Sequence, residues 1–202
     1  MKKEIKTTKF NQIIMTGVGE VNIHTAEEYF VVVNTTPKLM EYINVEVEDN
    51  TLILSMKKNS FMNLKNIIFD VYTPKIEKVI NTGVGNFNFI GDQNNSLSII
   101  HNGVGNYHLN DGTTETLTII QAGVGRIDAS KLIADKVSVN LSGIGNISVH
   151  AKDDLSVNIS GIGKVRNSGN IKPNNKNFNE ITKNMWFMSF IYLFCFILFA
   201  KN

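Results

Sequence analysis

Residues 97–129 read LSIIHNGVGNYHLNDGTTETLTIIQAGVGRIDA, a stretch in which the tripeptide Gly-Val-Gly occurs twice at a spacing of 20 residues. The chain contains six Gly-Val/Ile-Gly tripeptides, and the first glycines of the last five are spaced by 20, 20, 20 and 18 residues. A near-constant period of this length is typical of solenoid proteins, whose repeats bury their apolar faces only by stacking on one another. We expect tight corners of the chain at the motif glycines, which are Gly17, Gly19, Gly83, Gly85, Gly103, Gly105, Gly123, Gly125, Gly143, Gly145, Gly161 and Gly163.

Apolar and polar residues alternate on both sides of each glycine pair. Leu97 and Ile99 flank Ser98 before one motif, and Phe87 and Phe89 follow another. Such alternation is typical of a strand with one buried face. The sequence therefore predicts an all-β fold in which each repeat is one coil of a parallel β-helix, a solenoid of about 20 residues per coil with two short strands and a glycine corner. The inner column before the corners should hold Leu97, Ile99, Leu117, Ile119, Val137, Val139, Leu155 and Val157.

Composition limits the classes of partner. The chain has 202 residues, 43% of them hydrophobic, and a formal net charge of +2. This length suits one domain with an appendage. Lysines are scattered along the chain, so the basic patch of a nucleic-acid-binding protein is missing and we expect no nucleic acid partner. The single cysteine, Cys195, has no second cysteine with which to form an intrachain disulfide.

The chain divides into regions by composition. Residues 1–9 are a polar N-terminal extension without the apolar core of a signal peptide. Residues 10–166 form the predicted β-helix domain, and its regular repeats occupy 77–166. Residues 167–184 are rich in Asn and lack an apolar pattern, which is typical of a linker.

The early part of the domain, residues 10–80, is less regular. The 66 residues from Gly17 to Gly83 equal about three longer coils, so this part forms either irregular early coils or a capping sheet. The polar step Glu48-Asp49-Asn50 lies between two strand-like runs. Its composition predicts a hairpin turn.

The C-terminal segment 185–200 reads MWFMSFIYLFCFILFA and carries no charge. As a helix it would be about 24 Å long, slightly less than the hydrocarbon core of a bilayer. Flanking lysines suit the membrane interfaces. We predict a C-terminal hydrophobic helix that anchors a single-pass membrane protein; the alternatives are a buried core helix and a translated fragment of noncoding sequence. Residues expected in the anchor include Trp186, Phe190, Leu193, Phe196 and Leu198.

The glycine pairs do not match nucleotide or metal sites. No third glycine and no Gly-Lys-Ser/Thr sequence follows them, as a phosphate loop requires. Asn and basic residues stand where calcium-binding β-rolls carry aspartates. His24, His101 and His150 lack the spacing of metal ligands, and we expect each to be exposed or in a loop. We therefore expect no cofactor and no metal.

One pair of residues is a candidate for catalysis. His108 and Asp128 occupy equivalent outward positions in adjacent repeats. A polysaccharide-cleaving enzyme would need several carboxylates converging on one groove. Because only one carboxylate is found here, we interpret the two residues as a surface pair and expect a protein that is not an enzyme.

A polar row is the first candidate binding surface. Asn86, Asn106, Arg126 and Asn146 each lie three residues after a motif glycine and would stack along one edge. Stacked Asn side chains can hydrogen-bond to each other as a structural ladder. The alternative is a row that binds a glycan or another protein.

An apolar stripe is the second candidate. Ile80, Ile100 and Ile120 each lie three residues before a motif glycine, where alternation points them outward. Contiguous exposed apolar residues usually mark an interface or are covered by another part of the chain. The stripe is therefore covered by the N-terminal region, serves as a protein-binding or self-association site, or turns inward through a kink near His101 and Gln121.

Over about residues 10–166 the chain resembles the head GIN domain, an autotransporter-adhesin domain of bacterial envelope proteins. The resemblance is carried by the order of five segments: FNQIIMTGVGEVNI (10–23), EEYFVVVN (27–34), VEVEDNTLILSM (45–56), IIFDVYTPKIEKVINTGVGNFNF (67–89) and SGIGNISV (142–149). It implies a right-handed β-helix with an adhesive or scaffolding role in the cell envelope.

These observations together predict a non-enzymatic adhesin or scaffold domain, held at a bacterial envelope membrane by its C-terminal segment, with a glycan or a protein as its ligand. One alternative is a polysaccharide-active β-helix enzyme, which would release sugar products. The other is a self-assembling, membrane-bound β-helical filament, which would form in a concentration-dependent way.

Overall fold

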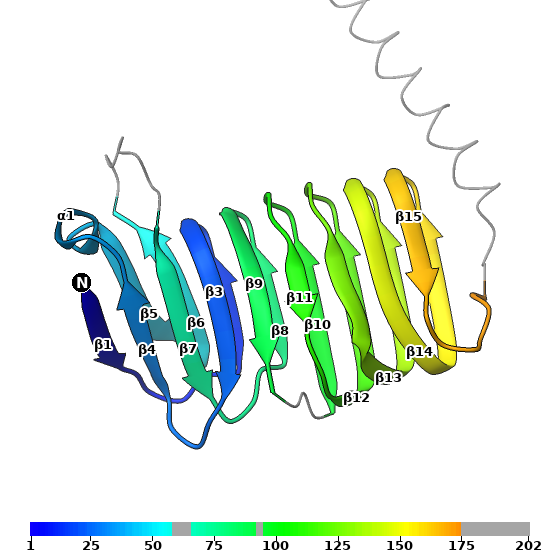
Figure 1. The fold of residues 1–202 in the computed structure, drawn as a ribbon, viewed down its shortest axis with the longest axis horizontal. Coiled ribbons are helices and arrows are strands. Elements are labelled where there is room, and N and C mark those ends of the chain that lie inside the picture. Colours follow the sequence, from blue (N-terminus) through cyan, green and yellow to red (C-terminus); the bar gives the residue numbers. More distant parts are fainter. Residues whose placement is uncertain (58–65, 92–94, 175–202) are drawn as a thin grey trace, which may run out of the picture.

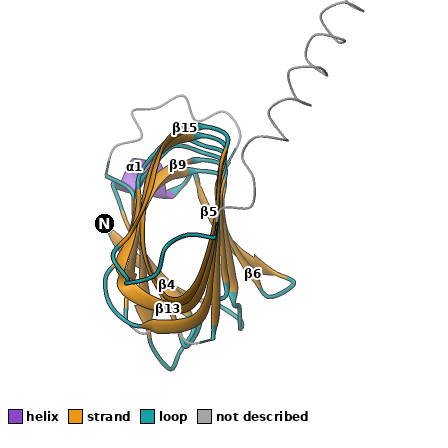
Figure 2. Ribbon diagram, turned by 90° about the vertical axis from the view of Figure 1, so that its right-hand side faces the viewer, coloured by secondary structure: helices purple, strands orange, loops and turns teal. Residues whose placement is uncertain are grey.

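The computed structural model describes residues 1–57, 66–91 and 95–174. In these ranges the chain forms fifteen strands and one short helix, and all the strands belong to one mixed sheet. The strands stack along the length of the molecule (Figure 1), and the sheet curls until it is nearly closed, with a flattened, barrel-like cross-section (Figure 2). The predicted all-β class is confirmed.

Two sets of strands form the broad faces of the molecule. We call the face whose strands run toward the glycine corners the approach face, and the face whose strands run away from them the departure face. The approach face consists, in spatial order, of β6 (Thr51–Met56), β2 (Gln12–Met15), β8 (Lys78–Asn81), β10 (Ser96–His101) and β12 (Thr113–Gln121). The departure face consists of β7 (Ile68–Thr73), β3 (Val18–Thr25), β9 (Val84–Ile90) and β11 (Tyr107–Leu109), and it ends in β15 (Ile162–Asn167).

Successive regular repeats pair in parallel with equivalent residues opposite each other. Ile99 lies opposite Ile119, which lies opposite Val139, so each strand is displaced from the next by one repeat. Inward side chains of both faces meet in one core, where the rings of Phe87 and Tyr107 stack with centroids 4.7 Å apart. The predicted inner column is buried, with relative exposures of 2% or less, apart from the partly buried last member.

The last repeats do not consist of two short strands. β13 (Ile127–Leu141) and β14 (Ile144–Ile159) each begin on the departure face and continue around the far corner onto the approach face. β13 has no glycine or proline, and the one glycine of β14, Gly145, lies at the glycine corner, so pairing continues through the far bend. Two register shifts between these strands supply the extra residues that a bent pair needs.

The first glycine motif lies beside the second in space, although 66 residues separate them in sequence. β2 pairs with β8 and β3 pairs with β9, both in parallel. The coil made by β6 and β7 stacks on the opposite side of β2 and β3. No other strand therefore lies between the coils of the first and second motifs. The residues between Gly17 and Gly83 instead extend the solenoid beyond the coil of the first motif, toward the N-terminal end of the molecule.

Antiparallel strands close this N-terminal end, as the capping-sheet alternative anticipates. β4 (Phe30–Asn34) pairs with β7, and β1 (Lys2–Lys6) forms the outer edge beyond it. β5 (Ile43–Glu48) forms the edge of the approach face beside β6. The short helix α1 (Pro37–Met40) connects β4 to β5, and the Oγ1 of Thr36 caps it by accepting from the Leu39 amide at 3.4 Å.

The hairpin turn predicted at Glu48-Asp49-Asn50 is confirmed. β5 and β6 pair antiparallel on either side of Asp49 and Asn50, whose φ angles are 46° and 60°. Two consecutive positive φ angles match a type I′ turn, in which Asn and Asp are favoured because they tolerate this conformation.

The predicted C-terminal helix over 185–200 lies outside the described residues, as does most of the predicted linker. Within the described part of the chain, no helix is long and apolar enough to cross a bilayer. Two residues of the predicted linker pair with the sheet: Asn167 is the last residue of β15, and Asn174 forms an isolated parallel bridge with Ser156.

Candidate functional site

The glycine pairs exist because adjacent coils touch backbone to backbone at the corner. A Cβ atom added to Gly123 would collide with the carbonyl oxygen of Gly103, and one added to Gly125 would collide with that of Gly105. Gly125 also has a φ of +155°, which residues with a side chain rarely adopt. The same collision, with the equivalent glycine one coil below, recurs at every later motif glycine. The two glycine columns therefore hold the coils at strand spacing around a sharp bend.

The residue between the two glycines points outward and forms a row that we call the glycine-corner ridge. Its members are Val84, Val104, Val124, Ile144 and Ile162, which pair in parallel from coil to coil. Their side chains are 46–71% exposed. The row is a continuous exposed line of β-branched apolar residues, and it accounts for most of the exposed large hydrophobic side chains of the described residues. This row was not predicted from the sequence, although the middle residue of every motif is a valine or an isoleucine.

The Asn row runs alongside this ridge and is a structural ladder. The Oδ1 of Asn86 accepts from the backbone amide of Asn106 at 2.9 Å and from its side-chain amide at 3.3 Å. The Oδ1 of Asn106 accepts from the amide of Arg126 at 2.9 Å. Asn86, Asn106, Arg126 and Asn146 are all exposed. The row thus links the coils while leaving side-chain groups open to solvent.

A polar column is buried directly behind the corner. Asn81, His101 and Gln121 are fully buried. The Oδ1 of Asn81 accepts from the amide of Gly83 at 2.9 Å, and the Nε2 of Gln121 donates to the carbonyl of Gly125 at 2.8 Å. These side chains add hydrogen bonds to backbone groups of the corner, where the Gly83 amide also donates to the Met15 carbonyl of β2 at 3.2 Å.

The expectation that His101 is exposed or in a loop is wrong. Its Nε2 donates to the carbonyl of Val124 at 3.1 Å, and its Nδ1 lies 3.4 Å from the hydroxyl of Tyr107. Burial lowers the pKa of His101, partly offset by the hydrogen bond to that carbonyl. Burial also raises the pKa of Tyr107 well above its usual value. The cluster stabilises the corner from inside and does not contact solvent.

The predicted isoleucine stripe faces outward, so the third alternative, an inward turn through a kink near His101 and Gln121, does not occur. Ile80 and Ile100 are half-buried, and Ile120 is 37% exposed. The N-terminal strands do not cross over the stripe. They lengthen it instead, because Ile14 pairs with Ile80 and Ile53 pairs with Ile14.

The structure places His108 opposite Asp128 in adjacent coils, as predicted. The carboxylate of Asp128 is already engaged, since it accepts from the hydroxyl of Ser130 at 2.7 Å and pairs with Arg126 at 3.0 Å. The Ser130 hydrogen bond is the main reason why the pKa of Asp128 lies below its usual range. A carboxylate held in its ionised form by local partners is a poor general acid.

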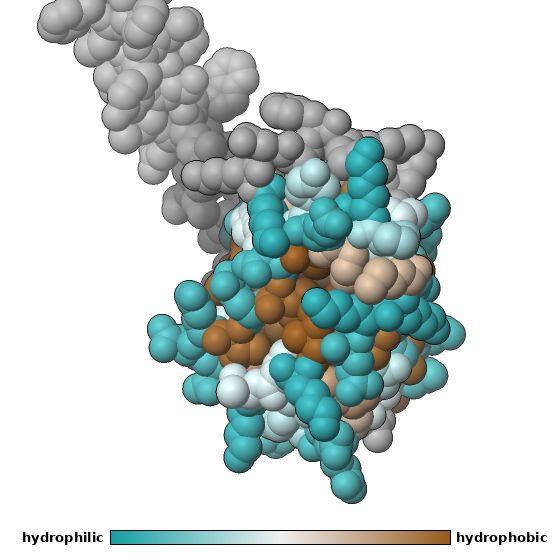
Figure 3. Space-filling view, turned by 90° about the vertical axis from the view of Figure 1, so that its left-hand side faces the viewer, coloured by the Kyte–Doolittle hydropathy of each residue, from teal (hydrophilic) through white to brown (hydrophobic). Residues whose placement is uncertain are grey.

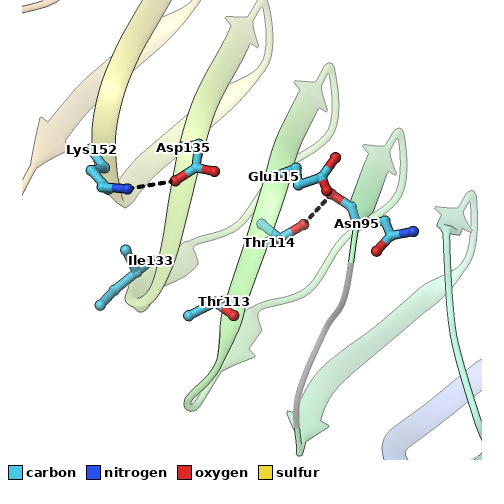
Figure 4. A pocket seen from close by; sticks show the side chains of 7 residues that line it. All are labelled: Asn95, Thr113, Thr114, Glu115, Ile133, Asp135 and Lys152. Carbon is cyan, nitrogen blue, oxygen red and sulfur yellow. Dashed lines mark hydrogen bonds and ion pairs between the residues drawn. The ribbon is translucent and has the colours of Figure 1, made fainter.

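A shallow polar groove of about 290 Å³ lies at the far corner of the coils, on the opposite side from the glycines (Figure 4). Lys152 and Asp135 form an ion pair of 3.2 Å across it, and the Thr114 hydroxyl donates to the Asn95 carbonyl at 2.9 Å. The groove lacks two facing free carboxylates. It is lined by Asn95, Thr113, Thr114, Glu115, Ile133, Asp135 and Lys152.

Comparison with known protein families matches residues 9–170 to the family described as "Putative auto-transporter adhesin, head GIN domain". Among solved structures, the chain is similar to a putative adhesin from Bacteroides fragilis, at 22% identity and a TM-score of 0.69 over 83% of this chain and 96% of that one. It is also similar to a putative adhesin from Parabacteroides merdae, at 18% identity and a TM-score of 0.53 over 87% of this chain and 96% of that one.

No curated protein matches the chain. At such identities the likeness to the solved structures shows the fold alone, whereas the family match covers most of the sequence, including all six glycine motifs. The glycine columns, the paired outward rows and this match lead to one conclusion: the chain belongs to the head GIN domain family.

Proposed function

We propose that this chain is the non-enzymatic ligand-binding domain of a bacterial cell-envelope adhesin, and that it contacts its ligand through the glycine-corner ridge. The observation that carries the proposal is the unbroken row of half-exposed Val and Ile side chains over successive coils. Contiguous apolar surface of this kind usually marks an interaction site, and stacked repeats commonly bind through such extended surfaces.

A protein ligand suits the ridge better than a glycan. Val104 and Val124 offer branched aliphatic side chains but no flat ring face. Burying such side chains against another apolar surface is favourable, at about 25 cal/mol per Å². The adjacent Asn row adds hydrogen-bonding groups, which fits the polar rim of a protein interface.

The proposal also covers the C-terminal segment and the handedness of the solenoid. We infer that residues 185–200 anchor the domain in an envelope membrane, because this segment of sixteen uncharged, predominantly apolar residues follows a polar segment. We also infer a right-handed β-helix, because parallel strands joined by crossover connections are right-handed in nearly all proteins. An intact-cell protease experiment tests the topology: protection in intact cells with cleavage after lysis would contradict surface exposure.

The ridge is tested by adhesion of bacteria that express the full chain to wells coated with collagen, fibronectin, mucin or purified polysaccharide. We expect adhesion to protein-coated wells, and we expect Val104→Ser with Val124→Ser to abolish it without lowering the thermal midpoint. The matched control is Ile100→Ser with Ile120→Ser, on the approach face of the same two coils. Adhesion that is lost only in this control would assign binding to the isoleucine stripe, and adhesion only to polysaccharide would favour a glycan ligand.

The enzyme alternative receives no support from the outer face. The one candidate carboxylate, Asp128, is engaged by Ser130 and Arg126. In the described residues no group of three or more His, Cys, Asp or Glu side chains is arranged to hold a metal ion. A ligand-binding role therefore accounts for the exposed rows more directly than catalysis.

A further inference from the structure

The N-terminal end of the solenoid exposes part of its core. Figure 3 views this end and shows a hydrophobic area at its centre, surrounded by hydrophilic residues. The inward side chains of the edge strands β1 and β5, together with Tyr29 before β4 and Met40 in α1, pack on the core but stay partly exposed. They are Ile5, Tyr29, Met40, Ile43, Val45 and Val47. In the described part of the chain, β1 and β5 are the last strands of the sheet at this end, so the outer edge of each has no neighbour.

The two edge strands carry opposite charges. β1 reads KKEIK, and its outward residues are Lys2, Glu4 and Lys6, which together carry a net positive charge. β5 reads INVEVE, and its outward residues include Glu46 and Glu48. Charged edge strands usually prevent unwanted pairing. Here a lysine-rich edge and a glutamate-rich edge lie on opposite sides of one apolar end.

We propose that the N-terminal end is a self-association surface, on which two copies of this chain form a closed dimer with β1 of one copy beside β5 of the other. A two-fold axis parallel to the strands exchanges the two faces of the solenoid. It places each lysine-rich edge against a glutamate-rich edge, and each apolar centre against its own copy. The strand directions agree, because β1 and β5 both run away from the glycine corner, as their pairings with β4 and β6 require.

The other end of the molecule disfavours open, head-to-tail stacking. The terminal departure strand β15 reads IGKVRN, with Lys164 and Arg166 exposed and no acidic residue. A filament would set the lysines of β1 against this basic strand, and like charges on neighbouring strands are destabilising. The charges of β1 and β15 therefore favour a closed dimer over a filament in which the departure faces of successive copies stay aligned.

The area of this surface sets the affinity that we expect for the dimer. The end spans strands of about six residues, or about 20 Å, on two sheets about 10 Å apart. Adding outward side chains gives an interface on the order of 500 Å² per copy, at the low end for specific association. We therefore expect a reversible dimer in the micromolar range that weakens as salt is added.

The test is the mass of the full chain in a mild detergent, measured by sedimentation over a range of concentrations. We expect dimers for the unaltered chain, and a weakening of at least about tenfold for Lys2→Glu with Lys6→Glu, or for Glu46→Lys with Glu48→Lys. Combining all four changes should restore the dimer, since the opposite charges then face each other again. The matched control, Lys164→Glu with Arg166→Glu at the far end, should leave the dimer unchanged.

A chain that stays monomeric throughout the range, or a dimer that ignores both N-terminal pairs of changes, would overturn the proposal. The proposal would also be overturned if the variant with all four changes failed to dimerise, because that result would show that β1 and β5 do not face each other in the dimer. A second measurement avoids dependence on folding of the variants. Isotopically labelled and unlabelled chains are mixed and treated with a carbodiimide, and mass spectrometry should find mixed-label peptides that join the lysines of β1 to the glutamates of β5. Exclusively same-label products would contradict the dimer.

Discussion

A methyl group at Gly125 has no room, because its Cβ would meet the carbonyl of Gly105 and its φ of +155° is strained for any residue with a side chain. We expect Gly125→Ala to lower the free energy of unfolding by about 2–5 kcal/mol, from backbone strain and overpacking together. Urea denaturation measures the loss. The control is Ala122→Ser in the same corner, where the residue is exposed and serine is found in the next two coils. Equal midpoints for both variants would contradict the close backbone contact.

The buried His101 predicts a dependence of stability on pH. Burial lowers its pKa below the usual value of about 6.5, so the unfolded chain takes up a proton first as the pH falls. The stability that the neutral ring contributes is complete above about pH 6.5 and is lost below it, by at most about 1.4 kcal/mol per pH unit. His101→Gln, which copies the residue at position 121, should flatten this slope between pH 7 and pH 5. An unchanged slope would show that other groups cause it.

The burial of His101 was not predicted from the sequence, although the signal was present. The residue two positions before the first glycine is apolar in other coils, as at Met15 and Leu141, and both are buried. A position that is apolar in some repeats is an inward position in all of them, because the repeats share one register. The polar side chains at this position hydrogen-bond to backbone groups of the corner, a role that a pattern of hydrophobicity does not express.

At the scale of a strand, neighbouring residues of β12 should differ sharply in their contribution to the free energy of unfolding. Ile119 is fully buried, whereas Ile120 on the opposite face is 37% exposed. Ile119→Ala should lower the free energy of unfolding by about 2–5 kcal/mol, through lost burial and a cavity. Ile120→Ala on the same strand should cost much less. Urea unfolding of the two variants measures the difference, and similar losses would mean that the outward stripe is covered.

The strands of the regular repeats could be predicted because period-two alternation and a fixed spacing reinforce each other, as at Leu97, Leu117 and Val137, which lie side by side. The continuity of β13 and β14 around the far corner could not. The alternation of apolar and polar residues does not show where a strand bends and still continues. At this bend the two paired strands contribute unequal numbers of residues, through register shifts.

At the scale of the molecule, the tail should decide how the protein partitions. Deleting residues 180–202 should convert a chain that requires detergent into one that does not, because sixteen uncharged apolar residues are removed. Far-UV circular dichroism should keep its β-sheet shape and lose only a helical contribution. Recovery of the full chain in the supernatant after a carbonate wash would contradict the membrane anchor.

The order of coils at the N-terminal end could not be predicted. The 20-residue period is absent between the first two motifs, so the sequence contains no indication that β2 and β3 stack directly on β8 and β9. That choice depends on long-range pairing and on the antiparallel strands that close the end. The repeat spacing and the alternation predicted the class of fold, and the family resemblance agreed with it, but which outward rows remain exposed can be read only from the assembled coils.

The glycine columns also govern how the gene for such a domain can change in length. Each motif glycine contacts the equivalent glycine one coil away, so excising or duplicating a whole repeat, such as residues 103–122, reproduces contacts of the same kind. Loss of a single residue within a coil instead exchanges the inner and outer faces of its strand. Recombination in multiples of the repeat is therefore tolerated, and shorter insertions and deletions should be confined to the loops at the far corner.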